Sequence, residues 1–167
     1  MSHRSEFERL VSDHEAMIGR ICASYENDRE LARELVQDVL FAIWRALPEY
    51  RADSSLKTFV ARIAQFRAIS HVARHSKLPA HEPVPADLLD GQAQPEVQAI
   101  AADERNRLQA AVRLLPFTYR EPAVLTLEDF THAEIAAAIG ITPDLVAVRS
   151  SRARALLRKL LGGNHER

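Results

Sequence analysis

Residues 131–143 read Thr131-His132-Ala133-Glu134-Ile135-Ala136-Ala137-Ala138-Ile139-Gly140-Ile141-Thr142-Pro143. Thr131 and Glu134 have the spacing of a capping box, which begins a helix, and Gly140 favours the end of that helix. Thr142 can cap a second helix, which then begins with a proline. Because Ala137 and Gly140 are small, the two helices can cross closely at the turn between them. The pattern predicts a helix-turn-helix.

The second helix of this pair, expected to reach about Leu161, is strongly basic. It carries Arg149, Ser150, Ser151, Arg152, Arg154, Arg158 and Lys159. No acidic residue occurs between Asp144 and Glu166. Arginines bind guanine edges and phosphates, and serines can reach either, so the sequence predicts a recognition helix for the major groove of DNA. A solvated amphipathic helix is the alternative, but it explains neither the missing acids nor the capped turn.

Further helices are predicted where apolar residues recur at helical spacing. They cover roughly residues 5–25, 28–47, 54–72, 100–115 and 122–127. The expected N-caps of the first three are Ser5 with Glu8, Asn27 or Asp28, and Ser54 or Ser55. Pro48 and Pro116 end the second and fourth helices, and Pro122 is placed in the first turn of the fifth.

A proline-rich, acidic segment separates the two groups of helices. Between Leu78 and Glu104 there is no Lys or Arg, whereas four of the eight prolines and five acidic residues occur there. This composition predicts a flexible linker over residues 78–103, with a surface loop of a single domain as the alternative. We therefore predict an all-α fold with two small helical domains. Residues 1–77 form a three-helix bundle, and residues 104–167 contain the helix-turn-helix.

The charge of the chain is unevenly distributed. The totals are 22 Lys+Arg and 23 Asp+Glu, a net charge of −1 that by itself argues against a nucleic-acid-binding protein. Residues 51–77, however, hold six basic residues and one acidic residue, a net charge of +5. Tyr50, Phe59 and Phe66 are interleaved with these charges, as expected for binding single-stranded nucleic acid. For Phe59 and Phe66, which are seven residues apart, a place in the core is the alternative.

Other classes of protein are excluded or disfavoured. Cys22 is the only cysteine, which excludes an intrachain disulfide and a zinc site with paired cysteines. Its apolar neighbours favour a core position over a redox sensor. No nucleotide-binding glycine loop and no nucleophile–base–orienter set is visible, so we expect no enzyme, cofactor or metal. No apolar run is long enough for a membrane span and no signal peptide is visible, so a cytoplasmic protein without membrane insertion is expected.

Several stretches resemble extracytoplasmic-function sigma factors of the sigma-70 family. Residues 34–47, Glu34-Leu35-Val36-Gln37-Asp38-Val39-Leu40-Phe41-Ala42-Ile43-Trp44-Arg45-Ala46-Leu47, resemble the region 2 helix, and residues 56–64 resemble the segment that follows it. Region 4 is matched in order by Leu114-Leu115-Pro116, Tyr119-Arg120, Glu134-Ile135-Ala136, Leu145-Val146 and Arg152-Ala153-Arg154. The resemblance covers nearly the whole chain, including the linker between the regions.

This resemblance implies an alternative sigma factor, a dissociable specificity subunit of RNA polymerase with a stress- or signal-responsive regulon. Region 2 would bind the clamp helices of core RNA polymerase and open the −10 element of promoter DNA. Region 4 would read the −35 element and touch the β flap. The resemblance also implies an anti-sigma factor as a partner. A near-neutral chain suits a protein that binds promoters only within polymerase.

The resemblance assigns site residues by motif position. Polymerase binding falls to Gln37 and Asp38, whereas Trp44 is expected in the core more than at the contact. The −10 set comprises Tyr50, Arg51, Lys57, Arg62, Phe66, Arg67, Ser70, His71 and Arg74, with the loop from Tyr50 to Ser55 capturing a flipped base. The −35 set comprises Arg120, Arg149, Ser151, Arg152, Arg154 and Arg158. Asp87, Asp90 and Glu96 either approach the RNA exit path or belong to a solvated spacer.

The chain departs from the family pattern at several positions. Phe66 stands where an Asn is usual, Ser70 where an Asp is usual, and Asp129 where a Gly is usual. Ala147 lacks a common basic residue, and Val148 stands where Ser is frequent. Two other interpretations remain at this stage. One is a stand-alone helix-turn-helix regulator, which would bind duplex DNA without polymerase. The other is a sigma mimic, although 167 residues leave no room for the receiver domain that such proteins usually carry.

Overall fold

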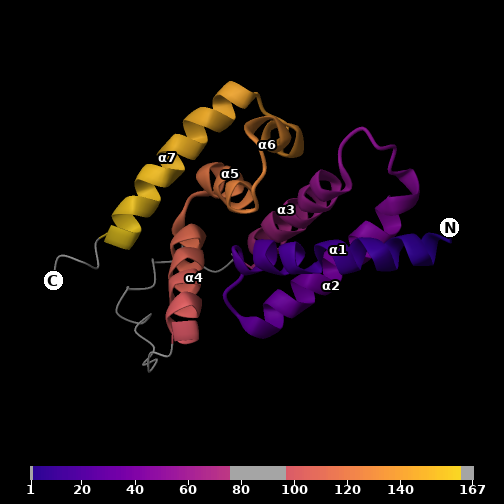
Figure 1. The fold of residues 1–167 in the computed structure, drawn as a ribbon, viewed down its shortest axis with the longest axis horizontal. Coiled ribbons are helices and arrows are strands. Elements are labelled where there is room, and N and C mark those ends of the chain that lie inside the picture. Colours follow the sequence, from indigo (N-terminus) through magenta and orange to yellow (C-terminus); the bar gives the residue numbers. More distant parts are fainter. Residues whose placement is uncertain (1, 76–96, 163–167) are drawn as a thin grey trace.

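The computed structural model describes residues 2–75 and 97–162, and these residues form only helices, turns and loops (Figure 1). The all-α prediction is therefore confirmed. Most of the predicted linker, including Asp87, Asp90 and Glu96, lies outside the described residues. The last residues of the predicted linker, 97–103, are the beginning of a helix.

The N-terminal half consists of α1 (His3–Ala23), α2 (Arg29–Ala46), the short 3-10 helix η1 (Leu47–Glu49) and α3 (Leu56–His75). The predicted capping box at Ser5 is wrong, because Ser2 caps α1 by accepting a hydrogen bond from the Ser5 backbone N–H. This earlier cap starts α1 three residues upstream of the predicted one. Asp28 caps α2 through the backbone N–H groups of its first turn. Ser55 accepts from the Thr58 backbone N–H at the start of α3.

The C-terminal half consists of α4 (Val97–Leu114), α5 (Phe117–Leu127), α6 (His132–Ile139) and α7 (Pro143–Gly162). Pro122 lies inside α5 rather than in its first turn, which corrects the sequence prediction. Pro116 is the residue that precedes the first turn, so α5 begins directly after it. The sequence allowed this error because Pro116 and Pro122, six residues apart, are both compatible with the start of a helix.

The helix-turn-helix forms as its local signals predict. Thr131 Oγ1 accepts from the Glu134 backbone N–H, and the Glu134 carboxylate accepts from the Thr131 backbone N–H, which completes the capping box. Gly140 has φ 81°, a left-handed conformation that costs glycine little. Thr142 Oγ1 accepts from the Leu145 backbone N–H at the start of α7. The turn is therefore fixed by side chains within a dozen residues of one another.

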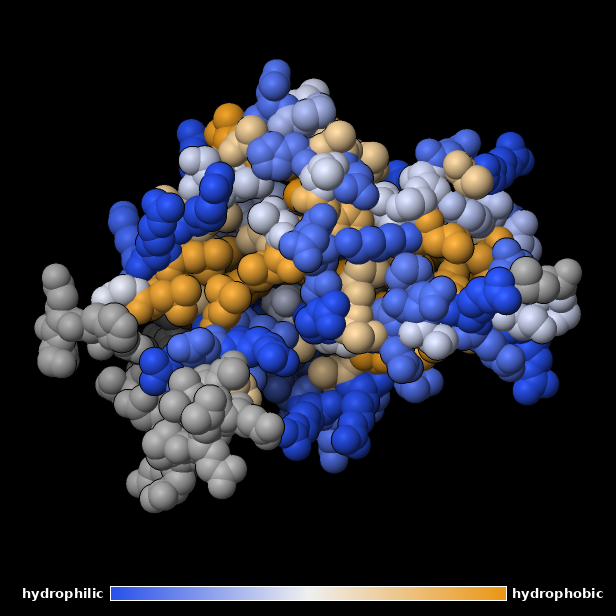
Figure 2. Space-filling view, in the orientation of Figure 1, coloured by the Kyte–Doolittle hydropathy of each residue, from blue (hydrophilic) through white to orange (hydrophobic). Residues whose placement is uncertain are grey.

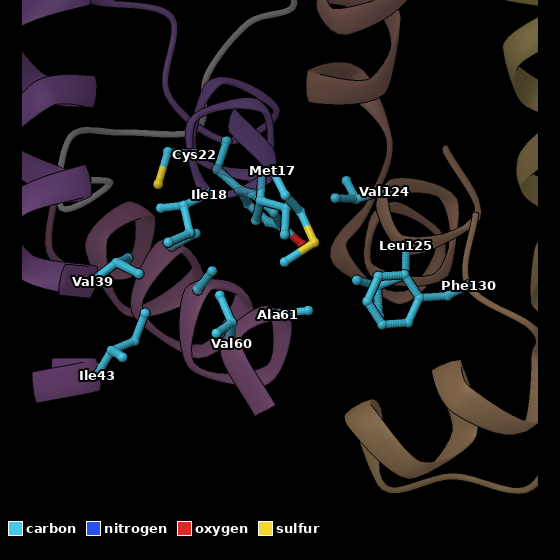
Figure 3. Packing of buried hydrophobic residues seen from close by; sticks show 14 of the residues in the cluster. Met17, Ile18, Cys22, Val39, Ile43, Val60, Ala61, Val124, Leu125 and Phe130 are labelled. Atoms are coloured by element: carbon cyan, nitrogen blue, oxygen red, sulfur yellow. The ribbon is translucent and has the colours of Figure 1, made fainter. Parts of the chain in front are cut away.

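The two halves pack against each other through one apolar core. Met17 of α1 and Ala61 of α3 belong to the same buried cluster as Val124 and Leu125 of α5 and Phe130 of the turn before α6 (Figure 3). In Figure 1, α5 and α6 lie directly beside α3, and both contact it. The predicted domains are thus joined by packing as well as by the chain.

Polar contacts reinforce this junction. The Arg20 guanidinium donates two hydrogen bonds to the Glu128 carboxylate, at 2.7 and 2.8 Å. Lys57 Nζ donates to the Glu128 backbone carbonyl at 2.8 Å and lies 4.4 Å from the centre of the Phe130 ring. Further bonds run from Gln65 Nε2 to the Glu121 carbonyl and from Arg113 Nη1 to the Ala23 carbonyl. We call the contacts of Arg20 and Lys57 with Glu128 and Phe130 the Glu128 junction.

The Glu128 junction can be tested by its effect on stability. A largely buried carboxylate held by a guanidinium fork contributes more than an exposed ion pair. The E128A variant should lower the free energy of unfolding by about 1–3 kcal/mol. Its matched control is E8A, which removes the exposed Arg4–Glu8 pair and should change this free energy by less than about 1 kcal/mol. Urea unfolding of both variants measures the difference, and equal small effects would contradict the role given to Glu128.

Candidate nucleic-acid interface

A short loop closed by Tyr50 leads into α3. The Tyr50 hydroxyl donates to the Ser54 backbone carbonyl, and the Tyr50 and Phe59 rings lie 4.8 Å apart. Ala52 has φ 58°, which a residue with a Cβ adopts only at a cost, and Arg51 is exposed. The predicted base-capturing loop is therefore a folded turn whose shape depends on the tyrosine. Phe59 packs on the core through this contact, as its alternative interpretation held.

The exposed side of α3 carries a stripe of basic, aromatic and hydroxyl side chains. Arg62, Phe66, Ser70 and Arg74 follow one another at intervals of four residues, which places them along one side of a helix. Arg62, Phe66 and Arg74 are exposed and Ser70 is partly exposed. We call these four residues the α3 stripe. Arg67 lies beside it, with Nη1 3.8 Å from Asp38 Oδ2 on α2.

Two residues of the predicted −10 set have their side chains engaged within the protein. His71 is 5% exposed, and its Nε2 lies 2.9 Å from the Glu26 carboxylate, so the structure places it inside the N-terminal half. The centre of the His75 ring lies 4.2 Å from that of His71, with the two planes tilted by 36°. The Lys57 ammonium takes part in the Glu128 junction. A count of basic residues along α3 does not reveal either arrangement.

The predicted polymerase-binding pair points in two directions. Gln37 is exposed, whereas Asp38 is turned toward α3. Within the described part of the chain, Asp38 Oδ2 is buried and accepts no hydrogen bond. Asp38 also borders a cavity of about 260 Å³ between α2 and α3, which is lined by Glu34, Leu35, Asp38, His71, Arg74 and His75.

The sequence reasoning missed Phe41, which is 58% exposed on α2. Its position four residues after Gln37, off the spacing of the core residues Leu35 and Val39, is the signal that could have identified it. Trp44 is 36% exposed and packs edge-on against Phe7, so it belongs partly to the core and partly to the surface. Gln37, Phe41 and Trp44 together form a mixed polar and aromatic side of α2.

Most of the predicted −35 set lies on α7. Ser151, Arg152, Arg154 and Arg158 are exposed, and Arg149 is partly buried. The opposite side of α7 packs through Val146, Ser150 and Ala153. Figure 2 shows apolar surface along the inner side of α7, where it meets α4 and α5, with hydrophilic side chains on the outer side. Ser151, Arg152 and Arg158 are thus on the open side of α7, whereas Arg154 borders a pocket formed with α5 and α6 and Arg149 lies within electrostatic range of Glu121 on α5.

Arg120 does not join this group. Its guanidinium donates to the backbone carbonyls of Leu115 and Arg113 and lies against the rings of Tyr25 and Phe117. Burial lowers the pKa of Arg120 from its ordinary value. In this structure the side chain holds together the connection between α4 and α5, so a phosphate contact would require it to give up these bonds.

Two family models of the sigma-70 family match successive parts of the chain. Sigma-70 region 2 matches residues 10–78, and Sigma-70, region 4 matches residues 105–157. The chain belongs to the sigma-70 family, as a factor of the extracytoplasmic-function type. The resemblance drawn from the sequence is confirmed, and the matched regions coincide with the two groups of helices.

Relatives and solved structures agree with this membership. The RNA polymerase sigma factor NccH of Alcaligenes xylosoxydans xylosoxydans is 27% identical over 164 residues, which cover 93% of this chain and 86% of NccH. The ECF RNA polymerase sigma factor SigM of Mycobacterium tuberculosis is 27% identical over 163 residues, 95% of this chain and 79% of SigM. CnrH, solved in complex with the cytosolic domain of CnrY, aligns with a TM-score of 0.71 at 23% identity, covering 96% of this chain and 90% of CnrH.

A second solved structure shows the same fold. The sigma factor RpoE, in complex with the anti-sigma factor NepR from Bartonella quintana, aligns with a TM-score of 0.70 at 20% identity, covering 94% of this chain and 97% of RpoE. Among the described residues, no helix has both the length and the apolar character that crossing a membrane requires. Residues 2–75 and 97–162 also hold no group of three or more His, Cys, Asp or Glu side chains placed to bind a metal.

Cys22 lies in the core of this sigma factor and is fully buried. Burial, with a further contribution from the negative charge of Asp38, raises the pKa of the thiol to about 12. Oxidation proceeds through the thiolate, so a neutral and buried thiol is a poor redox sensor. The geometry therefore supports the core interpretation of this residue.

The raised pKa of Cys22 has a consequence for stability at alkaline pH. Because the unfolded thiol ionises near pH 8.5 and the folded thiol stays neutral to about pH 12, ionisation favours the unfolded chain in between. The free energy of unfolding of the natural protein should fall relative to that of C22A as the pH rises through this window. The difference should be constant below about pH 8. Urea unfolding across pH measures it, and parallel profiles up to pH 11 would contradict the buried thiol.

Proposed function

We propose that this chain is an alternative sigma factor that binds core RNA polymerase, recognises the −35 and −10 elements of promoter DNA and initiates transcription of a stress- or signal-responsive regulon. It acts in the cytoplasm as a transcription initiation factor without catalysis of its own. The observation that carries the proposal is the tandem match of regions 2 and 4 on two groups of helices, each of which has one helix, α3 or α7, with exposed basic side chains. The domain limits follow as residues 1–77, 78–103 and 104–167.

In region 2, α2 binds polymerase and α3 binds the −10 strand. Gln37 and Phe41 on the outer side of α2 bind the clamp helices of polymerase, and Asp38, whose side chain is 35% exposed beside Arg67, contributes at the edge of this contact. The α3 stripe follows the separated −10 strand, with Arg62 and Arg74 on phosphates. The Tyr50 loop captures a flipped base, whose unstacking costs a few kcal/mol and must be offset by contacts in the loop.

In region 4, α7 lies in the major groove of the −35 element. Arg152 and Arg154 reach base edges, while Ser151 and Arg158 contact the backbone, in keeping with their exposure. Arg149, which is partly buried, reaches the groove from the first half of the helix. Apolar residues on the ends of α4 and α7 offer a surface for protein partners such as the β flap. They include Leu114, Leu160 and Leu161.

The packed arrangement of the two halves is the resting form of the factor. The −35 and −10 elements are centred about 25 nucleotides apart, or about 85 Å along B-form DNA. In the packed form α3 contacts α6 directly, so the DNA-binding faces of the two halves are too close to reach both elements. Binding to polymerase therefore separates the halves, which also releases Lys57 from the Glu128 junction for the −10 strand.

An anti-sigma factor holds this protein inactive until a signal arrives. The support is the state in which its structural neighbours were solved, CnrH with the cytosolic domain of CnrY and RpoE with the anti-sigma factor NepR. A partner of this kind would cover the polymerase-binding side of α2 and the apolar surface on α4 and α7.

Transcription with purified components tests the proposed function. The full chain, added to core polymerase and genomic DNA, should produce run-off transcripts from a limited set of start sites that share −35 and −10 sequences. Core polymerase alone should produce none of them. A chain that binds duplex sites without polymerase and directs no promoter-specific start would instead be a stand-alone regulator.

Two variants should separate DNA reading from polymerase binding. R152A should weaken use of matched promoters by about 5- to 100-fold and relax preference at one −35 position. D38A should lower the affinity for core polymerase, measured by fluorescence anisotropy of the labelled full chain, and leave the −35 preference unchanged at saturating polymerase. R9A, which removes an exposed arginine on α1, is the control and should change neither measurement. Equal losses in all three variants would contradict both assignments.

A further inference from the structure

Phe66 is the most exposed large apolar side chain among the described residues, at 67%. Its counterpart one heptad earlier, Phe59, packs against Tyr50 and the core, whereas Phe66 stacks on no other ring in the described part of the chain. The buried side of α3 is formed by Thr58, Val60, Ala61, Ala64, Gln65, Ala68 and His71. Folding therefore gains little from this aromatic ring.

A single exposed apolar residue needs no special explanation, but the neighbours of Phe66 are informative. Arg62 precedes it by four residues and Ser70 follows it by four, about 6 Å away along the helix axis in each direction. Arg74 lies one step further on the same side. The ring is thus the one apolar member of the α3 stripe, between two cations. Two acidic residues of α2, Glu34 and Asp38, border a pocket together with Arg74, and Asp38 is directed toward Arg67 of α3.

This arrangement has the components of a site for single-stranded nucleic acid. Such sites combine cations that neutralise the backbone with aromatic rings on which unpaired bases stack. The two arginines can contact phosphates on either side of a base that lies on the ring. The phenyl group has no hydrogen-bond donor or acceptor, so it cannot distinguish base edges.

We propose that Phe66 is a stacking platform for one unpaired base of the opened −10 region, and that this base is read by stacking rather than by hydrogen bonds. The proposal rests on the proposed function and defines how its −10 surface selects sequence. Because every base has a stacking face, preference at this position is graded, with purines favoured over pyrimidines for their larger rings. The rest of the −10 specificity then falls to the Tyr50 loop and the polar residues of the stripe.

Holoenzyme binding to labelled single-stranded oligonucleotides tests this proposal. One oligonucleotide represents each strand of the −10 region of a mapped promoter, with all four bases and an abasic site at each position. F66A and F66L should both bind about tenfold more weakly than the natural protein, and F66W should bind at least as well. F66L is the decisive variant, because it keeps an apolar side chain of similar reach and removes only the aromatic face.

The abasic series locates the contact. At one position, removal of the base should abolish the difference between the natural protein and F66L, whereas at all other positions the difference should persist. Circular dichroism should show equal thermal unfolding for all three variants, because the ring is exposed. Natural-protein affinity that falls in steps from purine to pyrimidine to abasic site at that position would support reading by stacking.

Other outcomes overturn the proposal. If F66L binds every oligonucleotide as well as the natural protein, the ring does not stack on a base. If F66A weakens assembly with core polymerase while F66L does not, Phe66 is an apolar docking residue for protein. Run-off transcription by the natural protein on the same promoters distinguishes these results from failure of the proposed function. If the natural protein gives promoter-specific transcripts but F66L binds as tightly as it does, only the stacking proposal is rejected. If no promoter-specific transcripts appear, the proposed function and the stacking proposal are both rejected.

Discussion

The Glu128 carboxylate, held by both donors of the Arg20 fork, is the interaction on which the arrangement of the two halves depends. Its backbone carbonyl receives Lys57, and two residues later the Phe130 side chain enters the shared core. The same short turn leads directly into the capping box of α6. The contacts of this turn therefore fix where the helix-turn-helix begins relative to α3. Arg20 of α1 and Lys57 of α3 bind Glu128, and Phe130 packs into the core, so this turn makes polar and apolar contacts with both helices.

The conformation of this turn explains one departure from the family sequence. Asp129 has φ 63°, in the left-handed region that glycine adopts most easily and that Asp tolerates better than most residues. The usual glycine at this position thus meets a requirement of the backbone rather than of a ligand. Asp129 meets it while leaving the flanking Glu128 and Phe130 free to make their contacts. A β-branched residue there would strain the turn that holds the halves together.

Local features of the fold could be predicted from the sequence, and features that depend on the other half could not. The capping box at Thr131 and the stop at Gly140 use partners only a few residues away, so their pattern is sufficient. The start of α1 at Ser2 instead of Ser5 shows that a capping pattern can also be met by a nearby residue. The shared core cluster contains both Met17 and Phe130, which are more than one hundred positions apart, and each looks like ordinary core in sequence.

In the candidate site, too, local features could be predicted from the sequence and long-range contacts could not. Periodicity places Ser151 and Arg152 on the outer side of α7, because the buried residues of that helix define its inner side. It fails for Lys57 and Arg120, whose cations bind backbone carbonyls that no charge pattern reveals. Burial of His71 likewise depends on Glu26, which lies on the loop between α1 and α2. A basic residue in an amphipathic helix is thus assigned to solvent or to a junction only by the fold.

The chemistry of the two exposed helices differs in a way that matches the two states of promoter DNA. Duplex DNA presents base edges in the major groove, and the arginines and serines of α7 supply the donors that such edges require. Opened DNA presents base faces and a flexible backbone, and the α3 stripe supplies an aromatic ring between cations. A recognition helix like α7 would read separated strands poorly, since their bases no longer hold fixed edges. If Phe66 stacks on an unpaired base as proposed, its exposed ring gains contacts only in the step in which the strands part.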